Sequence, residues 1–112
     1  MSHTLIEFYT ATSAWQALEA AGREAFFARI AEGMQAFAPG AVTPLAMGPV
    51  DRQLPHAAAA DYFAVWRCAD AVVVRQLVDA ITNSGWHDYF TTVNAAGASE
   101  DLAAHLRALA SA

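Results

Sequence analysis

The order of β-rich and helix-forming segments constrains the fold of this chain more than any other feature. Four segments rich in β-branched and aromatic residues are bounded by small polar residues, which is typical of strands. They are residues 4–10, 42–48, 61–68 and 86–94. Helical patterns fill the intervals after the first and third strands and follow the fourth. This βαββαβ order with a C-terminal helix predicts an α+β, ferredoxin-like fold with a four-stranded antiparallel sheet of order 4-1-3-2.

The second predicted strand contains Pro44, which has no amide proton to donate to a neighbouring strand. Such a strand belongs at the edge of a sheet. The order 4-1-3-2 places it there, so the proline agrees with an assignment made on other grounds.

The predicted helices begin at residues that can cap them. Ser13 and Gln16 form a capping box before a helix over 13–37, which Gly22 interrupts. Asp70 caps a helix that runs to about Asn83, and Ser99 caps the last helix.

Two helices cover only one face of a four-stranded sheet, so strand residues divide into a covered set and a bare set. We expect Ile6, Phe8, Phe63 and Val65 to face the helices. The bare face then carries a mixed aromatic and polar set. Its members are Leu5, Glu7, Tyr9, Tyr62 and Trp66. This face is too apolar for water, so we expect a second copy of the chain to pack against it.

The element order, the aromatic bare face and two stretches, LIEFYT at 5–10 and SGWHDYFTTVNAAG at 84–97, resemble the dimeric α+β barrel superfamily. Within it, the chain is similar to an uncharacterised bacterial group known as a domain of unknown function. The superfamily includes cofactor-free monooxygenases, cyclases, isomerases, haem-degrading enzymes and stress-induced proteins. The resemblance therefore implies a homodimer with a cavity for a small molecule, and it carries over no catalytic residue.

Glu7 is the most informative candidate residue, because a carboxylate among apolar strand residues is costly to bury without a partner. It is exposed at the barrel mouth, paired with an arginine such as Arg67, or functional with a raised pKa. His87 is the second acid–base candidate, since it would lie near Tyr9 in the predicted sheet. Alternatively, His87 is a histidine at a strand end or a dimer interface.

Other residues are candidates for the walls of the same pocket. Packing explains the aromatic ones equally well, and the loop histidine could be a lid or simply solvated. These candidates for ligand binding are Tyr9, Tyr62, Trp66, Trp86, Asp88 and His56. Residues 86–90 could also form a helical turn before the strand.

Composition excludes several classes of function. All six basic residues are arginine against eleven acids, so no Schiff-base lysine, P-loop lysine or phosphate-tracking patch exists, and nucleic acid is not an expected partner. The four histidines lack the spacing of metal ligands, and no cofactor motif is present, so we expect neither metal nor cofactor. Cys68 is the single cysteine, which fits a reducing cytoplasm, and it is expected to be inert.

The sequence thus predicts one domain over residues 1–112, in a cytoplasmic bacterial homodimer without a signal peptide or membrane segment. The leading functional hypothesis is binding of a small aromatic or hydrophobic molecule, with cofactor-free proton transfer or oxygenation as the reaction. The alternatives are a non-catalytic binding or stress-response module and a dimerisation scaffold.

Overall fold

The computed structural model describes residues 2–112 and has a four-stranded antiparallel sheet in the order β2-β3-β1-β4. β1 (His3–Ala11) lies between β3 (Tyr62–Cys68) and β4 (Phe90–Ala98), and β2 (Val42–Pro49) is the edge strand beyond β3. The predicted order is confirmed, read from the opposite edge. Pro44 lies in the edge strand as predicted, next to a break in the register between Pro44 and Ala46.

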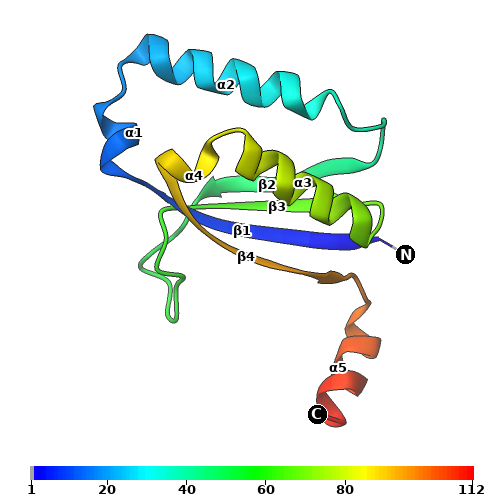
Figure 1. Cartoon of the computed structure of the whole chain (residues 1–112). Helices are drawn as coiled ribbons and strands as arrows, with labels where there is room; N and C mark the ends of the chain where they lie inside the picture. The colour runs from blue at the N-terminus through cyan, green and yellow to red at the C-terminus, as the bar shows by residue number, and fades with distance from the viewer. Residues whose placement is uncertain (1) are drawn as a thin grey trace.

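Helices α1 (Ser13–Ala17), α2 (Ala20–Met34), α3 (Ala71–Asn83) and α4 (Trp86–Tyr89) lie on one side of the sheet (Figure 1). Within that layer α3 lies close to the strands, and α2 lies farther from them. The C-terminal helix α5 (Leu102–Ala110) extends away from the rest of the chain (Figure 1). None of the helices in residues 2–112 is long and apolar enough to cross a membrane.

The structure corrects two predictions about the first helical segment. The helix predicted over 13–37 is broken at Leu18, so α1 and α2 are separate. Thr12, and not Ser13, caps α1 by accepting a hydrogen bond from the amide of Trp15, and its hydroxyl donates to the carbonyl of Tyr89. The bond to Tyr89 links the start of α1 to α4.

The two later caps differ in outcome. Asp70 caps α3 as predicted, because its carboxylate accepts from the amide of Val73. The last helix is capped by Asp101, which accepts from the amide of Ala104, and not by Ser99. Ser99 instead forms a side-chain hydrogen bond with Thr4.

Residues 86–89 form the short helix α4, so the predicted strand over 86–94 begins four residues later, at Phe90. The preceding Gly85 has a φ of 88°, which favours glycine because other residues have a Cβ that clashes in this conformation. This turn redirects the chain after α3, and it corrects the strand prediction in favour of the helical alternative.

The core lies between the sheet and the helices in two clusters. Leu5, Cys68, Val74 and Leu77 form one beneath α3. Trp15, Phe26 and Phe90 form the other, where α1 and α2 meet the start of β4. Since Leu5 is fully buried here, β1 presents its odd-numbered residues to the helices, and the predicted division of the two faces is wrong.

The corrected division follows from the strand register. Directly opposite residues of antiparallel strands share a face, so Leu5, Glu7 and Tyr9 face the helices together with Trp66, Ala64 and Tyr62. Ile6, Phe8, Phe63 and Val65 lie on the other side, which no element of residues 2–112 covers in Figure 1. We call this second side the open face. Apart from Glu7, both sets are aliphatic or aromatic, so alternation alone could not decide which set the helices would cover.

Candidate functional site

A cavity of about 230 Å³ lies between the sheet and helices α2 and α3. We call it the Glu7 cavity, because Glu7 is the one ionisable carboxylate among the residues that line it. β1 and β3 form its floor, and aliphatic, aromatic and methionine side chains form the rest. The lining residues are Glu7, Tyr9, Phe27, Ile30, Met34, Met47, Ala64, Trp66, Leu77, Ile81 and Trp86.

Glu7 is only 4% exposed and forms one side-chain hydrogen bond. The indole Nε1–H of Trp66 donates to Glu7 Oε1 at 2.7 Å. The strand register explains the contact, since Glu7 lies opposite Ala64, and Trp66 is its diagonal neighbour on the same face. Arg67, the partner considered from the sequence, lies on the opposite face and forms no ion pair within residues 2–112.

The surroundings of Glu7 favour the protonated form of its carboxyl group. Burial raises the pKa of Glu7 above its ordinary value of 4.5, because a charge loses the stabilisation of water. The Trp66 hydrogen bond and a positive charge on His87 lower the pKa and offset part of this effect. The Glu7 carboxyl group therefore holds its proton more tightly than an exposed glutamate does, in mostly apolar surroundings.

Tyr9 lies beside Glu7 on the floor of the cavity and belongs to an aromatic group. It stacks on Tyr62 with 5.9 Å between ring centroids and meets Trp86 edge to face at 5.2 Å. Burial raises the pKa of the Tyr9 phenol, and the nearby Glu7 and Tyr62 raise it further. Tyr9 is therefore a hydrogen-bond donor at neutral pH and not a phenolate.

Trp86 is fixed as a wall of the cavity by two interactions. Its indole Nε1–H donates to Thr92 Oγ1 at 3.0 Å, and its ring stacks on Phe90 at 4.1 Å. The αL turn at Gly85 brings this side chain back over β1. Trp86 therefore lines the cavity from a helical turn, and not from a strand as predicted.

The structure brings together four of the sequence-predicted site residues and separates the others. Glu7, Tyr9, Trp66 and Trp86 line the Glu7 cavity. Tyr62 stacks on Tyr9 and is 44% exposed. His87 and Asp88 are exposed on α4, and His56 is exposed in the 50–61 connection with a positive φ of 59°.

Sequence reasoning missed most of the cavity walls. Phe27, Ile30 and Met34 come from α2, and Leu77 and Ile81 come from α3. The separation of α2 from the sheet, which leaves a cavity beneath the helix, has no signature in the spacing of apolar residues.

Comparisons with known proteins identify the fold. A mutant chlorite dismutase from Candidatus Nitrospira defluvii superposes with a TM-score of 0.68 at 13% identity, covering 89% of this chain and 40% of that one. A putative chlorite dismutase, TA0507, gives 0.61 at 9% identity, covering 85% and 42%. The chain thus spans about two fifths of the length of these proteins.

A cofactor-independent oxygenase from Streptomyces nogalater, SnoaB, superposes with a TM-score of 0.48 at 12% identity, covering 89% of this chain and 94% of that one. No curated protein sequence matches the chain. The chlorite dismutase likeness supports the ferredoxin-like α+β fold that the sequence predicted. The family model for a group of unknown function, DUF6616, matches residues 2–112, and the chain belongs to that family.

Proposed function

We propose that this protein binds a small, uncharged, partly aromatic molecule in the Glu7 cavity and exchanges a proton with it through the Glu7 carboxyl group. The observation that carries the proposal is a buried carboxyl group with one oxygen held by the Trp66 indole, in a cavity whose other walls are mostly apolar. The volume of about 230 Å³ suits a molecule of one or two rings.

The chemistry follows from the environment of Glu7. In its ionised form, the carboxylate would take a proton from an acidic C–H or O–H group of the ligand and become the neutral acid. Its raised pKa makes it a stronger base than an exposed glutamate. Tyr9 lies on the same floor and can donate a hydrogen bond to the oxygen on which negative charge develops.

A small aromatic ketone in deuterated buffer provides a direct test. 2-Tetralone carries acidic C–H groups beside its carbonyl, and proton magnetic resonance follows their replacement by deuterium. We expect the protein to accelerate this exchange and Glu7→Gln to reduce the acceleration about 100-fold, the usual contribution of a general base. Glu24→Gln, which neutralises an exposed carboxylate on α2, should leave the rate unchanged.

His87 remains part of the proposal as a charge close enough to influence Glu7. If His87 is itself an acid–base group, His87→Ala abolishes the exchange of 2-tetralone without unfolding the protein. If it acts only through its charge, the same variant shifts the pH profile of the exchange upward and leaves the maximal rate unchanged. An unchanged profile and rate would remove His87 from the mechanism.

The second candidate function is non-catalytic binding of a metabolite in the same cavity, as in a sensor or stress-response module. The exposure of His87 and Asp88 favours non-catalytic binding. Neither residue lines the cavity, so Glu7 has no second carboxylate or imidazole beside it there to complete an acid–base pair. Native mass spectrometry of gently purified protein tests both candidates. Ala64→Leu fills part of the cavity and should remove the bound small-molecule mass, whereas Ala31→Leu on the exposed side of α2 should retain it. This result would support binding without requiring turnover.

We further propose that the protein is a homodimer of single-domain chains in the bacterial cytoplasm. The open face supports the homodimer, because Ile6, Phe8, Phe63 and Val65 would otherwise face water. The single, buried cysteine is compatible with a reducing compartment. If the Glu7 cavity binds nothing and the dimer forms, the remaining interpretation is a dimerisation scaffold.

A further inference from the structure

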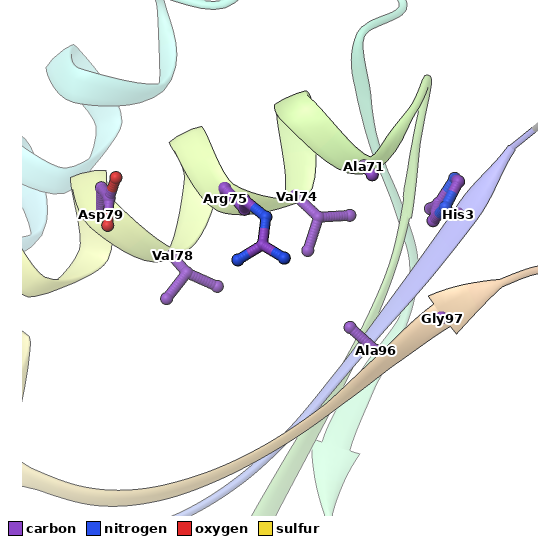
Figure 2. A pocket seen from close by; sticks show the side chains of 8 residues that line it. All are labelled: His3, Ala71, Val74, Arg75, Val78, Asp79, Ala96 and Gly97. Carbon is purple, nitrogen blue, oxygen red and sulfur yellow. The ribbon is translucent and has the colours of Figure 1, made fainter.

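A second hollow, of about 410 Å³, lies on the other side of α3 from the Glu7 cavity. Figure 2 shows it between α3 and the strands β1 and β4. The lining residues are His3, Ala71, Val74, Arg75, Val78, Asp79, Ala96 and Gly97. The space is left because β4 carries only small residues there, and a Cβ added to Gly97 would meet no atom within 4 Å.

Arg75 brings to this hollow a positive charge that is not part of an ion pair in residues 2–112. Within residues 2–112 the ion pairs join Arg52 to Asp61 and His105 to Glu100, and Arg75 forms none. Figure 2 shows the Arg75 guanidinium extending from α3 into the hollow, between Val74 and Val78. A guanidinium presents its donors in a planar fork that matches the two oxygens of a carboxylate.

His3 brings a second polar group to the end of the hollow at the start of β1. Its ring nitrogen Nδ1 is buried and has no hydrogen-bond partner within the described residues. Nε2 is then the nitrogen that remains available to a ligand. In the neutral ring, a proton on Nε2 makes it a donor and leaves Nδ1 as a bare acceptor.

We propose that this hollow binds a small organic monocarboxylate with an apolar body. The carboxylate pairs with the Arg75 guanidinium, Nε2 of His3 donates to the ligand, and the apolar body lies against Val74, Val78 and Ala96. The apolar wall favours a carboxylate on a hydrocarbon over inorganic phosphate. Asp79, at the end of the hollow opposite His3 (Figure 2), disfavours a second negative charge.

Benzoate is a suitable probe, and its neutral analogue benzamide has nearly the same shape. In a titration of isotope-labelled protein followed by nuclear magnetic resonance, benzoate should shift the backbone amides of 71–79 and 96–97 saturably. Benzamide should bind about tenfold more weakly or less, because it lacks the charge that pairs with Arg75. Glu7 would repel benzoate from the other cavity, so the positions of the shifted amides distinguish the two sites.

Two arginine variants complete the test. Arg75→Gln keeps the length of the side chain and should weaken benzoate binding at least about tenfold, the effect of losing one charge-assisted interaction. Arg107→Gln removes the same charge from the exposed last turn of α5 and should change the affinity less than about twofold. Equal affinity for benzoate and benzamide, an unaffected Arg75→Gln variant, shifts around Glu7 instead, or no saturable shift at all would each overturn the proposal.

Discussion

Leu5 and Ile6 are neighbours of similar size and hydrophobicity, yet they lie in opposite environments. Leu5 is fully buried beneath α3 with Val74 and Leu77, whereas Ile6 is half-buried on the open face. The covered face also holds the buried carboxyl group of Glu7 and the cavity around it. The two faces have similar apolar strand residues, so what separates them is the helix layer, and we propose that the open face is completed by a second chain.

The largest expected difference between the two faces comes from placing a carboxylate on each. Leu5→Asp buries an unpaired charge in the core and should cost more than about 4 kcal/mol of unfolding free energy, enough to prevent folding of a chain of this size. Circular dichroism and urea denaturation measure the effect.

The matched change on the open face, Ile6→Asp, should leave the circular dichroism spectrum that of a folded protein and convert the proposed homodimer into a monomer. Size-exclusion chromatography with light scattering measures the mass. Unfolding by Ile6→Asp as severe as by Leu5→Asp would show that the two faces are equally part of one core.

The next expected effect concerns Glu7 and depends on pH. The folded state raises the pKa of Glu7 above 4.5, its ordinary value. The contribution of Glu7 to the free energy of unfolding is therefore fully present below pH 4.5 and is lost as the pH rises through the pKa of the folded state. Gln can keep the Trp66 hydrogen bond without carrying charge. We therefore expect Glu7→Gln to unfold at higher urea concentration than the wild type at pH 7, by on the order of 1 kcal/mol.

At pH 4 this difference between Glu7→Gln and the wild type should disappear, because both side chains are then neutral. Glu24→Gln on the exposed side of α2 is the control and should show little difference at either pH. A Glu7→Gln variant that is less stable than the wild type at pH 7 would mean that the charged carboxylate is favoured in the folded protein.

The smallest expected effects come from the helix caps, which compare the packed helix α3 with the protruding helix α5. Asp70→Ala removes the bond to the amide of Val73 and should cost about 1 kcal/mol of global stability. Asp101→Ala removes the equivalent bond to Ala104, but α5 has no buried residue, so the loss should be confined to local fraying. Hydrogen exchange of the amides in each helix distinguishes a local from a global loss.

The strand order could be predicted because it depends on features with few alternatives. Pro44 restricts its strand to an edge, and the alternation of strand and helix leaves one common topology. The assignment of faces could not be predicted, because Leu5 and Ile6, or Val65 and Trp66, are equally suited to burial. Which face is buried depends on the side of the sheet on which the connecting helices pack, and the residues of the strands do not determine that side.

The candidate site was predictable in its central residue and not in its surroundings. A glutamate among apolar strand residues indicated a carboxyl group in an unusual environment, and Glu7 is buried with a raised pKa. Its hydrogen bond from Trp66 depends on the register of β1 and β3, which sequence patterns do not supply. Arg75 on α3 and His3 on β1 line the same hollow although they are 72 positions apart in the chain, and no sequence pattern pairs them.

The pKa of Glu7, measured by carbon-13 magnetic resonance of its side-chain carboxyl carbon in the wild type and in Trp66→Phe, tests the covered face most directly. Burial in the cavity predicts a value above 4.5 in the wild type. Loss of the Trp66 hydrogen bond, which favours the ionised form, predicts a still higher value in Trp66→Phe. A wild-type value at or below 4.5, unchanged by the substitution, would contradict a buried carboxyl group held by Trp66 in an apolar cavity.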